Sequence, residues 1–165
     1  MPPAPTKAST RSPSKQVEAF IRKFDPAVAK LARAARSAMR KRFPTAVELV
    51  YDNYNALAIG FATTERTSDV IVSVAVYASG VNLYFMYGRS LPDPEKLLQG
   101  EGNQGAFIRF PDVTVLDDAG VDALLTAATK HAKPPLRTTG RGYTIVKSIS
   151  AKQRPRRFGR ATSKA

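Results

Sequence analysis

The chain has 165 residues, enough for one hydrophobic core and too few for two ordinary ones. Its 43% apolar and 24% charged residues are typical of a globular protein. Cysteine is absent and there is one histidine, which excludes disulfides, thiolate metal sites, thiol nucleophiles and a histidine-rich metal site. Neither a signal-peptide apolar region nor the ~18 apolar residues of a membrane span is present, so we expect a soluble cytoplasmic protein with no membrane partner.

The net charge of +13 is unevenly distributed. Residues 1–15 carry three basic side chains and no acid, and residues 130–165 carry eleven and no acid. Eight further bases lie between Arg22 and Arg42, which leaves four bases against eleven acids from Phe43 to Thr129, a net charge of −7. A basic groove is therefore not expected in the β region, whereas the ends of the chain can attract anions.

Residues 1–14 are rich in Pro, Ser, Thr and Ala and predict a disordered basic arm. From Lys15, apolar residues at helical spacing predict a first helix. Asp25 and Pro26 are typical of an N-cap and first helical position, and Pro44 ends this second helix. Its polar face is predicted to consist of six basic residues: Lys30, Arg33, Arg36, Arg40, Lys41 and Arg42.

The period then changes from helical spacing to strand alternation. The predicted strands are 47–52, 56–62, 69–78, 81–87 and 106–110, with one more possible at 143–149. Asp93 and Pro94 predict a short helix through Gln99, and Asp117 or Asp118 caps a last helix that ends near His131. Short turns between successive strands favour an antiparallel meander.

One side of the strands carries large aliphatic residues, and the other carries small and polar ones. In the first strand Val47, Leu49 and Tyr51 oppose Glu48, Val50 and Asp52. We therefore predict an α+β domain, with an antiparallel sheet of about five strands and N-terminal and C-terminal helices packed on one face. The predicted organisation is a disordered arm (1–14), the α+β domain (15–132), an extension with a possible extra strand (133–149) and a disordered basic tail (150–165).

Residues 100–105 spell G-x-G-x-x-G. The dinucleotide-binding fingerprint needs a strand before this motif and a helix after it, so that pyrophosphate meets a helix N-terminus. Here the predicted order is reversed, which favours a helix stop and a flexible turn.

Glu48 and Asp52 share one face of a strand and are the only candidates considered for a metal site. Four strand steps separate them by ~13 Å, too far for a glycosidase pair or a shared metal without a partner from another strand. Ordinary solvated acids are the favoured interpretation.

His131 falls in the last turn of a helix, where a cation complements the helix dipole. No nucleophile or orienting carboxylate accompanies it in the sequence, so we expect no enzyme and no cofactor. The basic face between Arg22 and Arg42 is interpreted as solvated rather than as an anion site.

The tail has a stronger pattern, because five cations flank an aromatic residue, Phe158. The cations are Lys152, Arg154, Arg156, Arg157 and Arg160. Such a segment binds phosphate backbones without sequence specificity, or acts only as a solubilising disordered end, and both interpretations stay open.

Three segments resemble the YdhG-like family of bacterial domains of unknown function: 48–51, 87–100 and 107–110, the most specific part being the run from Gly88. The resemblance runs from about Val17 to His131 and implies a helix-covered antiparallel sheet. Some relatives are described as frataxin-like iron chaperones, an activity that would rest on acidic residues of a helix and the first strand. Here the first helical segment offers only Glu18 and Asp25, and Glu48 and Asp52 are what remains of an acidic edge.

Three functions are therefore considered. The first is a non-enzymatic binding domain that takes a small ligand or a protein partner on the open sheet face. Tyr84, Arg89 and Arg109 are its candidate ligand-binding residues, and Arg89 and Arg109 are the candidates to hold an anionic group. The face itself is small and polar (Ala58, Gly60, Ser73 and Ala75), and Tyr84, Met86 and Arg109 are expected to border it. The second is non-specific association with nucleic acid through the basic tails, and the third is frataxin-like iron carriage.

Overall fold

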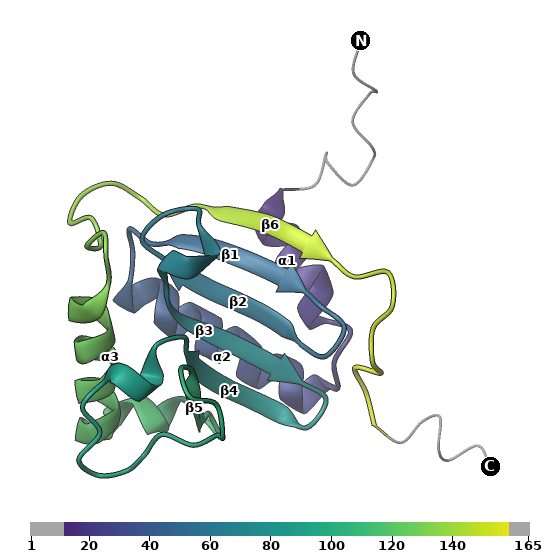
Figure 1. Cartoon of the computed structure of the whole chain (residues 1–165). Coiled ribbons are helices and arrows are strands. Elements are labelled where there is room, and N and C mark those ends of the chain that lie inside the picture. Colours follow the sequence, from purple (N-terminus) through teal and green to yellow (C-terminus); the bar gives the residue numbers. More distant parts are fainter. Residues whose placement is uncertain (1–11, 159–165) are drawn as a thin grey trace.

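The structure is a computed structural model that describes residues 12–158. Six strands form one sheet in the order β5-β4-β3-β2-β1-β6 (Figure 1). The strands are β1 (Val47–Asp52), β2 (Leu57–Ala62), β3 (Val70–Tyr77), β4 (Gly80–Phe85), β5 (Ala106–Arg109) and β6 (Thr144–Ile149). The helices are α1 (Pro13–Ile21), α2 (Pro26–Arg42) and α3 (Ala119–His131), with 3-10 turns η2 (Thr67–Asp69), η3 (Gly88–Ser90) and η4 (Val113–Asp117).

The α+β class is confirmed, but the sheet is mixed and has six strands rather than five antiparallel ones. Strands β1 to β5 form the predicted antiparallel meander, whereas β6 runs parallel to β1. The parallel direction arises because the chain leaving α3 returns to the end of the sheet where β1 begins. There Gly142 N–H donates to the Pro44 carbonyl at 2.8 Å, and Glu48 N–H donates to the Tyr143 carbonyl at 2.8 Å.

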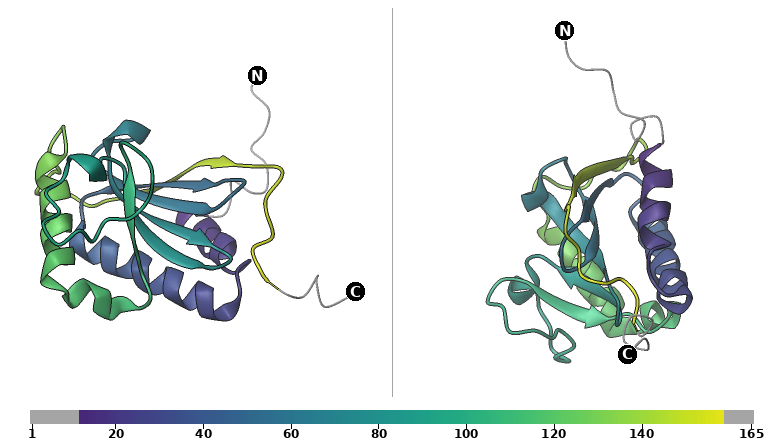
Figure 2. Two further views of the ribbon diagram at one scale, coloured as in Figure 1. Left: turned by 60° about the horizontal axis from the view of Figure 1, so that its bottom comes forward. Right: turned by 90° about the vertical axis from the view of Figure 1, so that its right-hand side faces the viewer.

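Helices α1 and α2 cover one face of the sheet, and α3 lies at one end of it (Figure 2). The helix-covered face of β2, β3 and β4 is aliphatic and aromatic because alternate residues point to it. These residues are 5% exposed or less: Leu57, Ile59, Phe61, Val72, Val74, Val76, Val81, Leu83 and Phe85. They form the main core with the apolar sides of the helices.

The opposite face carries the small residues that the alternation predicts. The strand registers pair Gly60 with Ser73 and Ser73 with Tyr84. In the next row, Ala58 pairs with Ala75, which in turn pairs with Asn82.

Strand β1 reverses the expected orientation of its two faces. Glu48 and Asp52 share the helix-covered side with Val50, which belongs to the main core. Val47 and Leu49 pack with Ala62 in a second small cluster. The two acids predicted to be solvated are therefore buried, 3% exposed at Glu48 and 0% at Asp52.

Helix starts follow the capping residues closely. The Ser12 hydroxyl accepts from Lys15 N–H, so α1 begins at Pro13 and includes the last two residues of the predicted arm. Residues 1–11 of that arm lie outside the described part of the chain. Helix α3 begins after Asp118, whose carboxylate accepts from the N–H groups of Gly120 and Val121.

The helix predicted from Asp93 to Gln99 does not form. The Asp93 carboxylate accepts from the N–H groups of Leu97 and Leu98 at 2.8 and 2.9 Å, which closes a turn. Lys96 has a φ of 54°, a left-handed conformation that a helix cannot contain. Gln99 then pairs with Phe107, so the glycine-rich segment is a loop leading into β5.

Residues 150–158 are packed against the domain rather than forming part of a disordered tail. Ser150 and Arg154 N–H groups donate to the carbonyls of Asp52 and Tyr54, each at 2.9 Å. Arg156 is 7% exposed and lies over the ring of Phe24, 5.3 Å from its centroid. Arg156 donates to the Asp52 carboxylate and the Asn53 carbonyl, and these charge-assisted hydrogen bonds explain why residues 150–158 pack against the domain despite their polar composition.

Candidate functional site

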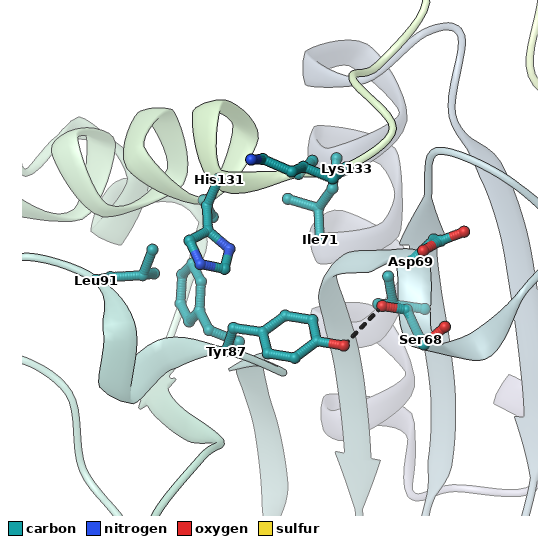
Figure 3. Close-up of a pocket in the computed structure, with 11 residues that line it drawn as sticks. Ser68, Asp69, Ile71, Tyr87, Leu91, His131 and Lys133 are labelled. Carbon is teal, nitrogen blue, oxygen red and sulfur yellow. Dashed lines mark hydrogen bonds between the residues drawn. The ribbon is translucent and has the colours of Figure 1, made fainter.

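A cleft of about 470 Å³ opens at the end of the sheet next to α3 (Figure 3). Three segments that are distant in sequence form it: 68–71 at the start of β3, 85–91 after β4, and 128–133 at the end of α3. Its volume falls in the range of about 300–1,000 Å³ that is typical of small-ligand sites.

The walls of the cleft combine apolar and polar side chains. The apolar part comes from Val70, Ile71, Phe85, Leu91, Ala128 and Ala132. The polar part comes from Ser68, Asp69, Tyr87, His131 and Lys133. An apolar surface with a few converging polar groups is the usual composition of a ligand pocket.

Tyr87 and His131 form an aromatic wall of the cleft (Figure 3). Their ring centroids lie 5.7 Å apart with an interplanar angle of 35°. The Tyr87 hydroxyl donates to the Ser68 carbonyl at 2.8 Å, which fixes the tyrosine ring across the cleft. Asp69 on the same side accepts from the Thr64 hydroxyl at 2.6 Å.

The position of His131 follows from where α3 ends. Ala132 has the extended backbone of a C-cap, and its N–H donates to the Thr129 carbonyl. Within residues 12–158 the His131 imidazole and the Lys133 ammonium have no hydrogen bond or ion pair with the protein. Both groups are thus available to a ligand in the cleft.

The sequence-predicted ligand residues lie elsewhere. Tyr84 and Arg109 do share the open sheet face, where Tyr84 pairs with Phe107 and Arg109 with Asn82. Arg89 does not join them, because its guanidinium donates to the carbonyls of Gly100 and Gly102 and holds the loop before β5. None of the three lines the cleft beside α3.

Glu48 is part of a buried ion pair. Its carboxylate accepts two hydrogen bonds from the Arg36 guanidinium, at 2.6 and 2.8 Å, and one from the Thr144 hydroxyl at 2.6 Å. Arg36 is 8% exposed, so it belongs to the interior and not to the predicted polar face of α2. Arg40 lies 4.0 Å from the same carboxylate.

Asp52 is paired from two directions, by Lys23 at 2.7 Å and by Arg156 at 2.8 Å. Burial alone would raise the pKa of Asp52. Hydrogen bonds from Lys23, Gln153 and Arg156, with the Coulomb attraction of Lys23, outweigh burial and hold the pKa below its ordinary value of 3.8. Asp52 is therefore a charged structural acid at neutral pH.

These pairings bear on the proposed metal ligands. Each carboxylate already has hydrogen-bond donors, and the two belong to separate pairs, one with Arg36 and one with Lys23 and Arg156. In the part of the chain that the structure describes, no group of three or more His, Cys, Asp or Glu residues could hold a metal ion.

The tail residues divide by role. Lys152, Arg154 and Arg157 are exposed, whereas Arg156 is buried and pairs with Asp52. Arg156 is thus not free to contact nucleic acid, which corrects its assignment to a binding tail. Arg160 lies outside the described residues.

None of the helices in residues 12–158 has the length and apolar character needed to cross a membrane. Comparison of the chain with protein-family models, with curated proteins and with solved structures finds no match. The resemblance to the YdhG-like family therefore stays a prediction.

The sequence reasoning missed the cleft because its residues come from three separated segments. One signal was present: the chain's single histidine, at the end of an amphipathic helix. The sequence alone favours a helix-capping role for it. Its role as a wall of a cleft depends on Tyr87, 44 positions earlier in the sequence, whose proximity no local pattern encodes.

Proposed function

We propose that the chain is a non-enzymatic binding domain whose small-molecule ligand occupies the cleft beside α3. The observation that carries the proposal is the composition of this cleft, in which an apolar interior meets Asp69 and two basic side chains, His131 and Lys133, that make no hydrogen bond or ion pair within residues 12–158. This site is preferred to the open sheet face, because the bonds of Arg89 to the Gly100 and Gly102 carbonyls direct its guanidinium toward the loop before β5.

The lining favours a particular class of ligand. A flat apolar body would pack against the rings of Tyr87 and His131 and the aliphatic side chains around Leu91. An acidic group at the mouth would pair with the ammonium of Lys133. The ligand class is therefore a small organic acid with an aromatic or apolar body.

Iron carriage is less well supported by the contacts. Glu48 and Asp52 would have to give up bonds to Arg36, Lys23 and Arg156 before they could bind a cation. Releasing buried arginines from buried acids leaves uncompensated charge, which disfavours metal binding at these positions.

A thermal-shift screen tests the ligand proposal. The panel contains aromatic and aliphatic carboxylates and phosphate monoesters, each with its neutral amide or alcohol analogue. A ligand at 100 times its Kd stabilises the folded state by ~2.7 kcal/mol, which for a chain of this size raises Tm by roughly 5–10 °C. We expect acids to produce such a shift and their neutral analogues to produce less.

Two variants identify the site. Ala132→Phe fills the cleft and should abolish the shift, and Lys133→Ala should weaken it selectively for acids. Lys130→Ala, an exposed lysine of the same helix turn that does not line the cleft, should behave as wild type. An equal shift in Ala132→Phe, or no shift from any acid in the panel, would contradict the proposal.

A further inference from the structure

A second cleft, of about 570 Å³, lies at the opposite end of the sheet from α3. It is lined by the β1–β2 turn, the β3–β4 hairpin and residues 153–158. In Figure 1 the C-terminal segment passes beside the ends of these two hairpins. Among residues 12–158, ten line the cleft, and they include two arginines and no acid.

This cleft concentrates exposed aromatic rings. Five tyrosine or phenylalanine side chains in residues 12–158 are more than a third exposed, and three of them line it. They are Tyr54 (49% exposed), Tyr77 (37%) and Phe158 (62%). Exposed rings gathered in one place are unusual on a protein surface and indicate a contact site.

Cations are interleaved with these rings. The Arg154 guanidinium lies 5.9 Å from the centroid of the Tyr54 ring, within cation–π distance. Arg157 donates to the carbonyls of Arg22 and Lys23 at the end of α1, at 3.1 and 3.0 Å. Those bonds use two of the five N–H groups of Arg157 and leave the others to an anion.

The C-terminal wall of this cleft, residues 153–158, is held in place by the buried Arg156 and by backbone hydrogen bonds. Arg156 donates to the Asp52 carboxylate at 2.8 Å and to the Asn53 carbonyl at 2.7 Å. The Tyr54 carbonyl accepts from Arg154 N–H at 2.9 Å. Arg156 therefore fixes the segment, while Arg154 and Phe158 on either side of it face the cleft.

From these observations we infer that the Tyr54–Tyr77–Phe158 cleft binds single-stranded nucleic acid. Aromatic faces stack on unpaired bases, and adjacent arginines neutralise the phosphate backbone. A duplex hides its base faces and offers only its phosphates, so the aromatic residues favour single strands. The cleft has both the aromatic rings that stack on bases and the arginines that pair with phosphates, on a segment fixed by Arg156.

Fluorescence anisotropy with the full chain and labelled oligo-dT and oligo-U of about 12 nucleotides tests the inference. A duplex of the same length and a polyglutamate peptide of similar charge are the comparison ligands. We expect binding to both single strands, weaker binding to the duplex and to polyglutamate, and a loss of affinity between about 50 and 200 mM salt. A preference for oligo-U over oligo-dT, or the reverse, would identify RNA or DNA as the source.

Variants separate stacking from charge. Tyr54→Leu and Tyr77→Leu should each weaken single-strand binding by roughly 5- to 100-fold, while Tyr54→Phe retains the ring and wild-type affinity. Arg154→Ala should reduce the slope of log affinity against log salt by about 0.7. Tyr143→Leu, an exposed tyrosine outside the cleft, and Arg66→Ala, an exposed arginine of the β2–β3 loop, are the matched controls.

Circular dichroism melts of each variant confirm that it is folded. The inference is overturned if Tyr54→Leu and Tyr77→Leu bind as tightly as wild type, because binding would then come from charge alone. It is equally overturned if polyglutamate or duplex DNA binds as well as the single strands, or if no single strand binds.

Discussion

Replacing Arg36 by methionine removes the partner of a carboxylate that is almost completely shielded from water. Glu48 is 3% exposed and takes hydrogen bonds of 2.6 and 2.8 Å from Arg36. After the substitution it keeps the Thr144 hydroxyl and the charge of Arg40, whose side chain is half exposed and 4.0 Å away. A buried charge left without its partner destabilises a protein by about 3–5 kcal/mol.

We therefore expect Arg36→Met to lower the free energy of unfolding by about 3–5 kcal/mol. Because a chain of this size loses ~2–4 °C of Tm per kcal/mol, the corresponding fall in Tm is roughly 6–20 °C. Urea denaturation followed by circular dichroism measures the change, with an unaltered m-value indicating that the unfolded state is unaffected. Movement of Arg40 toward Glu48 would place the result at the lower end of this range.

Two further variants make the measurement decisive. Arg33→Met, on the same helix, removes an exposed pair with Glu18 and should cost less than ~1 kcal/mol. The double variant Arg36→Met with Glu48→Met replaces both charges with apolar groups of similar volume and should recover most of the lost stability. If Arg36→Met is no worse than Arg33→Met, or if the double variant is as unstable as Arg36→Met, the account of the buried pair is wrong.

Other consequences of the structure can be measured in the same way. Arg156→Met should lower the free energy of unfolding by about 2–3 kcal/mol. This is less than the loss expected for a buried acid with a single partner, because Lys23 still pairs with Asp52. Amide hydrogen exchange in residues 150–158 should become faster. The folded-state pKa of Asp52 is lower than its unfolded value, so its stabilising contribution is present at neutral pH and is lost as the pH falls from about 3.8 through the folded pKa. In Asp52→Asn the urea midpoint should therefore fall less steeply as the pH is lowered through the acidic range. If the midpoint of the variant falls as steeply as that of wild type, the lowered pKa of Asp52 is contradicted. Gly142→Ala places a methyl group against the Ala46 carbonyl and should prevent β6 from docking, which loss of strand signal in isotope-edited infrared spectra would report.

Much of the fold could be predicted because its signals are local. Period-two alternation locates β1 to β4, and Pro26 and Asp118 mark where α2 and α3 begin, whereas the Ser12 cap starts α1 two residues before the predicted Lys15. The segment at Asp93 has the Asp-Pro pair that is typical of a helix start. The apolar residues after it do not continue at helical spacing for long enough to stabilise a helix, and a turn forms instead.

The failures concern contacts between distant parts of the chain. The alternation in β1 has apolar residues on both faces, so the sequence does not say which face meets the helices. That choice depends on Arg36 and Arg156, which neutralise Glu48 and Asp52 from 12 and 104 positions away. Similarly, the residues of the cleft beside α3 share no local pattern, and only the sheet order and the end of α3 bring them together.

The separation of Asp52 and Arg156 also constrains the order of events during synthesis on the ribosome. Strand β1 and its antiparallel partners can pair as soon as they emerge, but Asp52 then has only Lys23 as a cation. Contacts across 104 positions form late because the intervening chain must be made and ordered first. The docking of residues 150–158 is therefore the step that completes the charge balance of the interior, and the same step assembles the aromatic cleft.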